Sequence, residues 1–230
     1  MRRRRLPAVD VLLDAGAKID ARTSYGTTAW SHAMRRGFPE VAARLAERGA
    51  DTGLSEAESL CVALIQARND EAGAMLERDP QLVSKLDPET ARIFPDLACR
   101  GLVDGMRLLL DAGVDITARG LDGGTALHQT GWFGVPAATA LLIERGAPLD
   151  IKGDDHDGTP LAWTAHGSRY SGDAEARVQD YAAVAELLCA AGASMKDATR
   201  PSDPPGWQLL EDAVPAVAEV LRRYGARERS

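Results

Sequence analysis

The densest group of side chains with chemical potential lies between positions 154 and 166. Asp154, Asp155, His156 and Asp157 are consecutive, and His166 follows nine residues after the last of them. Carboxylates and imidazoles bind metals and act as general acids and bases, so this group is compatible with a metal-dependent enzyme. The same residue types are common in tight turns, where they are solvated or hydrogen-bond to the local backbone. Metal binding or catalysis by this cluster is therefore the minor alternative.

No other arrangement predicts catalysis. The sequence has no serine in a nucleophile elbow, no cysteine beside a histidine with an orienting acid, and no phosphate-binding GxxxxGK loop followed by Ser or Thr. We therefore expect a protein that is not an enzyme and that has no catalytic residue, cofactor or metal.

Charge and composition exclude several classes of partner. The formal net charge of −7 argues against a nucleic-acid or membrane-surface binder, because such proteins need a basic surface. The one basic run, Arg2 to Arg5, is terminal, and no apolar run approaches the ~18 residues of a membrane span.

The aromatic content bears on the core. Aromatic residues make up only 5% of the chain, a low fraction for a protein with one large central core.

The cysteines indicate a reducing environment. Cys61, Cys99 and Cys189 are odd in number, widely spaced and without metal-ligand spacing, so we expect small core thiols and a cytoplasmic location.

The basic residues are mostly arginine. Of the 27 basic residues, 4 are lysines and 23 are arginines, a bias that suggests a GC-rich bacterial gene.

A phrase with an apolar pair before a glycine recurs along the chain. It reads LLDAGAKID at 12–20, LAERGADTG at 45–53, LLLDAGVDI at 108–116, LLIERGAPLD at 141–150 and LLCAAGASM at 187–195. Including a last glycine at 225, the glycines are separated by 33, 64, 33, 46 and 33 residues. A fixed period of this length predicts stacked units rather than one globular core.

A second string recurs between these phrases. It reads YGTTAWSHAMRRG at 25–37, DGGTALHQTGWFG at 122–134 and DGTPLAWTAHG at 157–167. Thr28, Thr125 and Thr159 stand where a hydroxyl caps a helix, and Pro160 suits a first helical position. Together the two strings resemble the ankyrin repeat family. That resemblance implies an all-α solenoid of helix-turn-helix units joined by short hairpin loops, and makes His128 a structural bracket between adjacent hairpins.

The resemblance covers almost the whole chain, 1–230, as a single array. Its units are a half unit at 6–22, a unit at 23–51, a degenerate one at 52–84, units at 87–119 and 120–152, one with an insertion at 153–198, and a C-terminal cap at 199–230. In the degenerate unit Asp79 and Pro80 replace the glycine phrase. The insertion, near Ser168 to Asp180, is polar, and we expect a surface loop.

The half unit lacks its opening helix. Leu6, Val9, Leu12 and Leu13 then have no cover on their N-terminal side. Because solenoids end in polar caps, we expect either a natural start upstream or a charged substitute in the arginine run.

The resemblance also indicates a recognition surface, formed by the residues after each first helix's alanines and by the hairpin tips. Placed on this sequence, it predicts these partner-binding residues: Arg35, Arg36, Arg100, Trp132, Phe133 and His166 on the first helices, and Tyr25, Arg119, Asp122 and His156 on the hairpins. Aromatic and arginine side chains are common interface anchors.

The adjacent Trp132 and Phe133 carry most of this prediction, because two large aromatics flanked by glycines are hard to bury together on one short helix. The alternative is that Trp132 packs under the neighbouring helix and Phe133 alone is exposed. Trp30 and Trp163 are expected in the core.

The family resemblance therefore implies a non-catalytic, monomeric module that binds another protein, through a segment bearing carboxylates and apolar groups. A regulatory or inhibitory subunit of a neighbouring enzyme, similar to an antitoxin or immunity protein, is the main alternative.

Overall fold

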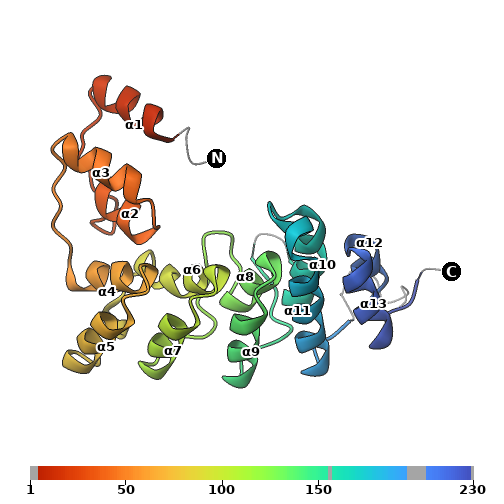
Figure 1. Cartoon of the computed structure of the whole chain (residues 1–230). Coiled ribbons are helices and arrows are strands. Elements are labelled where there is room, and N and C mark those ends of the chain that lie inside the picture. Colours follow the sequence, from red (N-terminus) through yellow and green to blue (C-terminus); the bar gives the residue numbers. More distant parts are fainter. Residues whose placement is uncertain (1–4, 155–156, 196–205, 229–230) are drawn as a thin grey trace. The chain divides into compact units, whose positions relative to one another are not determined.

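The computed structural model describes residues 5–154, 157–195 and 206–228, and this part of the chain is helical, with two isolated β-bridges and no strand (Figure 1). Its α-helices are α1 Arg5–Asp14, α2 Ala29–Arg35, α3 Pro39–Glu47, α4 Glu56–Ile65, α5 Asn69–Arg78, α6 Ile93–Arg100, α7 Val103–Asp111, α8 Ala126–Phe133, α9 Pro136–Glu144, α10 Pro160–Tyr170, α11 Val178–Ala190, α12 Trp207–Asp212 and α13 Pro215–Arg223. The described residues also form the 3-10 helices η2 Val83–Lys85, η3 Thr90–Arg92 and η4 Ala174–Arg177.

The chain divides into two compact units. Unit 1 is Met1–Ile93 and unit 2 is Phe94–Ser230. In unit 1, α1 packs on α3, and α2 packs on both α3 and α4. The apolar side chains at the start of the chain are partly uncovered, since Val11 is 66% and Leu12 61% exposed.

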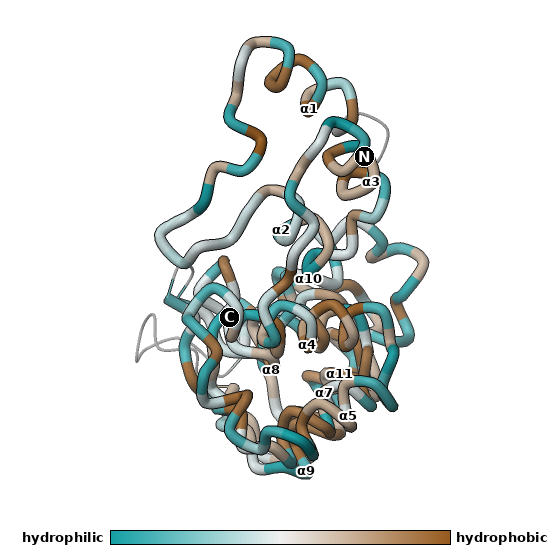
Figure 2. Tube along the Cα trace, turned by 90° about the vertical axis from the view of Figure 1, so that its left-hand side faces the viewer, coloured by the Kyte–Doolittle hydropathy of each residue, from teal (hydrophilic) through white to brown (hydrophobic). Residues whose placement is uncertain are grey.

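Unit 2 is built from two stacks of helices. Helices α8, α10 and α12 pack side by side in one stack, and α7, α9, α11 and α13 pack in the other (Figure 1). The leucine pair Leu141 and Leu142 of α9 is fully buried between its neighbours. In Figure 2, both hydrophobic residues, in brown, and hydrophilic residues, in teal, occur in the trace around α7, α9 and α11.

The helix boundaries follow from residues that the sequence analysis identified. Thr28, Thr125 and Thr159 are the N-cap residues of α2, α8 and α10, and Pro160 is the first residue of α10. The predicted C-terminal glycines adopt positive φ angles, for example +63° at Gly134, the left-handed conformation that glycine allows at little cost. In the degenerate unit, α5 ends at Arg78, directly before Asp79 and Pro80.

The segment near Ser168 to Asp180 lies mostly at the surface, as predicted, but it is not a continuous loop. Its residues extend α10 to 11 residues, form η4 and begin α11, which has 13 residues. Ser168, at 1% exposed, and Ala174, at 4%, are its buried residues and anchor the segment.

No helix in the described ranges is long and apolar enough to cross a membrane.

Candidate functional site

His128 holds two neighbouring hairpins together. Its Nδ1 lies 3.1 Å from the backbone nitrogen of Thr125, and its Nε2 lies 3.0 Å from the carbonyl oxygen of Gly158 in the next unit. Because a backbone N–H only donates, Nδ1 is the acceptor and Nε2 carries the proton. Burial lowers the pKa of His128 to about 4, so the ring is neutral at pH 7. The predicted structural role of His128 is confirmed.

The described members of the carboxylate and histidine cluster, Asp154, Asp157 and His166, each lie close to a side chain of opposite or complementary charge. Asp155 and His156 lie outside the described residues, while Asp154 lies 3.3 Å from Arg119 and Asp157 lies 3.0 Å from Lys152. His166 lies 3.7 Å from a carboxylate of α12, at Asp212. Within the part of the chain that the structure describes, no three His, Cys, Asp or Glu side chains form a group that could hold a metal ion.

The aromatic pair on α8 splits into one packed and one exposed ring. Trp132 is half-buried, with its ring centroid 6.1 Å from that of Trp163 and 5.7 Å from that of His166. Phe133 is 37% exposed. The structure therefore matches the second of the two expected placements. Trp163 is in the core at 6% exposed, whereas Trp30 is only half-buried, so the expectation for Trp30 is wrong.

The aromatic row continues onto the inserted segment. The ring of Tyr170 lies 4.4 Å from the ring of His166, one helical turn earlier on α10, and Tyr170 is 57% exposed. Sequence reasoning missed Tyr170 because a loop was expected there. The spacing of four residues between two aromatic side chains was the available signal. We call Trp132, Phe133, His166 and Tyr170 the aromatic row; ring contacts join Trp132, His166 and Tyr170, and Phe133 is included as the exposed neighbour of Trp132 in the sequence.

In unit 1 the structure corrects the expectation of an exposed Arg35. This side chain is buried, and its guanidinium donates to the Glu89 carboxylate at 3.3 Å and to the Thr27 hydroxyl at 3.1 Å. Burial raises the pKa of Glu89, but the hydrogen bond from Thr27 and the charge of Arg35 outweigh this and lower it overall. A partner cannot reach Arg35 without breaking this ion pair.

Two of the predicted hairpin residues are also engaged within the protein. Arg119 donates to the carbonyl oxygens of Gly123 at 2.5 Å and Lys152 at 3.0 Å. Asp122 accepts two hydrogen bonds from the amide of Gln129, at 2.7 and 2.8 Å. These contacts make both residues part of the hairpin scaffold.

Solved structures show which fold this geometry belongs to. The ankyrin repeat domain of human ASB11 matches with a TM-score of 0.51 and 22% identity, over 99% of this chain and 96% of that one. An ankyrin repeat domain from Acinetobacter baumannii AYE matches with a TM-score of 0.54 and 20% identity, over 98% of this chain and 95% of that one. This chain has the ankyrin repeat fold. The predicted all-α repeat architecture is confirmed.

Sequence comparison gives a narrower likeness. No family model matches the chain. Serine/threonine-protein kinase 12 from Arabidopsis thaliana is 38% identical over 66 residues, which are 29% of this chain and 14% of the kinase. The likeness is thus confined to a short stretch of a much longer protein.

The predicted contact residues of this ankyrin array fall into distinct groups. In unit 2, Arg100, Phe133 and His166 are exposed, and the structure brings His166 together with Trp132. In unit 1, Tyr25 is 51% exposed on its hairpin and Arg36 is half-buried after α2. Tyr25 and Arg36 belong to a separate compact unit and are treated as a separate surface.

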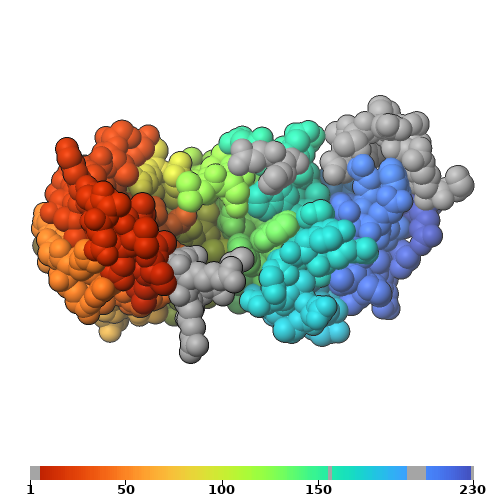
Figure 3. Space-filling model, turned by 90° about the horizontal axis from the view of Figure 1, so that it is seen from above, coloured from red at the N-terminus to blue at the C-terminus, as the bar shows by residue number. Residues whose placement is uncertain are grey.

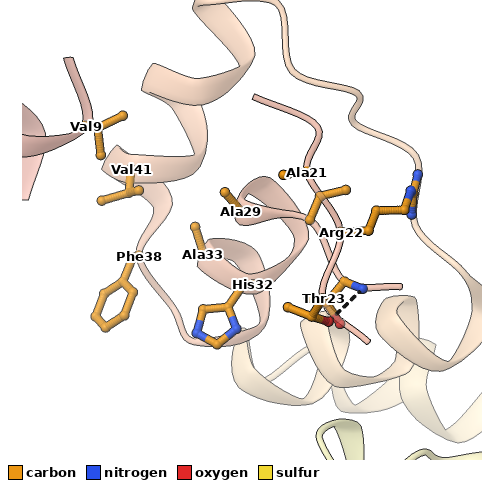
Figure 4. Close-up of a pocket in the computed structure, with 11 residues that line it drawn as sticks. Val9, Ala21, Arg22, Thr23, Ala29, His32, Ala33, Phe38 and Val41 are labelled. Atoms are coloured by element: carbon orange, nitrogen blue, oxygen red, sulfur yellow. Dashed lines mark hydrogen bonds between the residues drawn. The ribbon is translucent and has the colours of Figure 1, made fainter. Parts of the chain in front are cut away.

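Unit 1 also contains a largely apolar pocket of about 550 Å³ beside α2 (Figure 4). Its walls combine residues of α1, α2 and α3 with those of the first hairpin. The lining residues are Val9, Ala21, Arg22, Thr23, Thr27, Thr28, Ala29, His32, Ala33, Phe38 and Val41.

Proposed function

We propose that this ankyrin array is a non-catalytic protein-binding module whose partner docks on the aromatic row of unit 2. The observation that carries the proposal is the row itself: Phe133 and Tyr170 expose 37% and 57% of their surface on two adjacent helices. Exposed aromatic side chains on rigid helices lose little conformational entropy on binding and bury large areas, which makes them frequent interface anchors.

The chemistry of the row favours a partner segment that is apolar. Phe133 and Tyr170 offer mainly apolar ring surface, which an apolar segment of the partner would bury. We therefore propose that the partner contributes an apolar segment.

The test compares substitutions at two aromatic side chains whose exposed fractions are similar. We would tag the full chain, recover bound proteins from the native cells and identify them by mass spectrometry, using the wild type, Phe133→Ala and Tyr224→Ala. Tyr224 is 41% exposed near the end of α13, so it is a matched control. The proposal requires that Phe133→Ala loses a protein that Tyr224→Ala keeps. Equal recovery by all three chains would refute it.

We also propose that the protein works as a monomer in the cytoplasm. Cys61 and Cys189 are buried and none of the three cysteines forms a disulfide, which suits a reducing compartment. Light scattering coupled to size-exclusion chromatography tests the monomer, since a mass near 49 kDa instead of 24.5 kDa would show a dimer.

A further inference from the structure

The inserted segment of unit 2, near Ser168 to Asp180, bonds backward to the end of α8. Arg177 of η4 donates from Nη1 to the carbonyl oxygen of Phe133 at 2.7 Å and from Nη2 to that of Gly134 at 2.8 Å. The last carbonyls of a helix have no intrahelical donor, and a cation is stabilising at this end of the helix dipole. Arg177 therefore caps α8 from the following helix pair of the array.

Tyr181, directly after the segment, adds a buried contact with the same helix end. Its hydroxyl donates to the carbonyl oxygen of Trp132 at 2.7 Å. Because a tyrosine hydroxyl carries one proton, the Ser171 hydroxyl donates to it in turn, over 2.5 Å. Tyr181 is fully buried, and a Cβ atom at Gly134 would lie 3.1 Å from three carbons of its ring. One buried tyrosine therefore joins α11 to α8 by both packing and a hydrogen bond.

The same segment bonds forward to the turn between α12 and α13. Helix α10 has 11 residues and α8 has 8, and Ser168 and Arg169 lie in the additional turn. The Ser168 hydroxyl accepts from the backbone N–H of Val214 at 3.1 Å. Arg169 donates from Nη2 to the carbonyl oxygen of Ala213 at 2.9 Å. Ser168 and Ala213 are buried, so the additional turn of α10 holds α12 and α13 through backbone groups that are shielded from water.

Internal contacts tie the two ends of the segment together. Ser171, the C-cap residue of α10, hydrogen-bonds to Tyr181 of α11, and Ala174 of η4 is buried between them in the sequence. The segment therefore opens as one body. In the space-filling view its residues, in cyan, lie between the green surface of the preceding helices and the blue surface of the C-terminal helices (Figure 3). Since units of a solenoid touch only their neighbours, a single segment that bonds in both directions links two successive interfaces.

We propose that the inserted segment is a clasp that couples the opening of α12 and α13 to its own unfolding. Ser168 and Arg169 hold the turn between these two helices, while Arg177 and Tyr181 hold the segment on α8. The pair α12 and α13 then separates from the array only when the segment also leaves α8. This role goes beyond the proposed function, because all of these bonds form within unit 2 and involve no partner.

The first test measures the opening of α13 in the free protein. Native-state amide hydrogen exchange is followed by NMR in the full chain, for the slowest amides of α11 and α13. The chains compared are the wild type, Tyr181→Phe, which keeps the ring and its packing, and Tyr181→Phe combined with Arg177→Gln. In the described part of the chain, the hydrogen bonds of both side chains go to α8 and to the segment itself, and not to α13. We expect exchange in α13 to accelerate about fivefold in the single variant, as for loss of one buried hydrogen bond, and at least tenfold in the double variant.

Thr139→Val is the matched control. Thr139 is fully buried, and its hydroxyl donates to the carbonyl oxygen of Val135, the N-cap residue of its own helix α9, at 2.9 Å. Valine has nearly the same shape, so this variant loses one buried hydrogen bond and leaves the segment untouched. We expect exchange in α13 to change less than twofold.

The second test determines whether the forward and backward bonds act through one body. Ser168→Ala with Arg169→Gln removes the forward bonds, and Tyr181→Phe is then added to this background. We expect the forward substitutions alone to accelerate exchange in α13 at least tenfold, while exchange in α11 changes less than threefold. Adding Tyr181→Phe should then change α13 less than twofold, because α13 no longer opens through the segment.

Three results would overturn the clasp. Unchanged exchange of α13 in both Tyr181 variants would mean that α12 and α13 open without the segment. An equal acceleration in Thr139→Val would mean that any lost buried bond has the same effect. A fivefold effect of Tyr181→Phe both with and without the forward bonds would mean that the two sets of bonds are independent.

Discussion

The buried His128 makes unit 2 sensitive to acid in a defined pH range. The pKa of His128 is lowered from 6.5 to about 4, mainly by burial and to a smaller extent by the charge of Arg119, while the hydrogen bond to Gly158 opposes the shift. The folded state therefore binds the proton less well than the unfolded chain. The contribution of the neutral His128 to the free energy of unfolding is fully present above about pH 6.5 and is lost as the pH falls toward 4. The linkage relation gives a loss of about 2 kcal/mol by pH 5 and about 3 kcal/mol by pH 4.

The comparison needs a variant that does not titrate but keeps the local fold. His128→Gln serves, because His128 is the third residue of α8 and glutamine at this position completes a capping box with the N-cap Thr125. Urea unfolding is followed by tryptophan fluorescence between pH 7.5 and 4.5. Trp132, Trp163 and Trp207 all lie in unit 2.

We expect the wild type to lose about 2 kcal/mol more than His128→Gln between pH 7 and pH 4.5. Carboxylates with lowered pKa values, such as Glu89, lose their contribution at lower pH, because their unfolded values are near 4.5. They are also present in both proteins and cancel in the difference. Parallel free-energy curves for the two proteins would refute the assignment of His128 as a buried neutral bracket.

Three further substitutions or treatments test the packing. Gly167→Ala should lower the free energy of unfolding of unit 2, measured in urea, by about 2 kcal/mol, because the added Cβ would overlap the backbone of Trp132. The control is Gly172→Ala, where an added Cβ would meet no atom within 4 Å, and it should change this free energy by less than about 0.5 kcal/mol. Arg35→Met should cost about 3 kcal/mol of unfolding free energy, since it leaves the Glu89 carboxylate without its guanidinium; a loss below about 1 kcal/mol would contradict a buried pair. Burial raises the pKa of Cys189 to about 11. A disulfide reagent at pH 8 should therefore label this thiol only after denaturant is added. Rapid labelling of the native protein would contradict the burial of Cys189.

The sequence predicted those features of the fold that depend on a single residue's backbone preference. A threonine before a short apolar stretch and a glycine after it mark the same helix ends in successive units, as at Thr125 and Gly134. Repetition strengthened each assignment, since a signal that is weak once is reliable at a fixed interval. The role of His128 followed from its place in the repeated string for the same reason.

Side-chain exposure could not be predicted in this way, because it depends on partners distant in the sequence. The buried Arg35 pairs with Glu89, which is 54 residues later in the sequence. The helical part of the inserted segment was not predicted, and its contacts are equally distant: Arg177 bonds to a carbonyl 44 residues earlier, and Tyr181, directly after the segment, bonds to one 49 residues earlier. Neither contact leaves a periodic signal in the sequence.

In unit 2, the glycines of the hairpins determine which aromatic ring is buried. Trp163 is buried because three glycines leave room for its indole: a Cβ atom at Gly124, Gly153 or Gly158 would lie 2.8, 3.3 or 3.2 Å from it. The turn strings that contain these glycines therefore serve packing as well as chain reversal. With Trp163 fixed, Trp132 packs edge-on against it, at 6.1 Å and an interplanar angle of 74°. Successive residues of an α-helix lie about 100° apart around its axis, so Phe133 falls outside this contact, and it is 37% exposed.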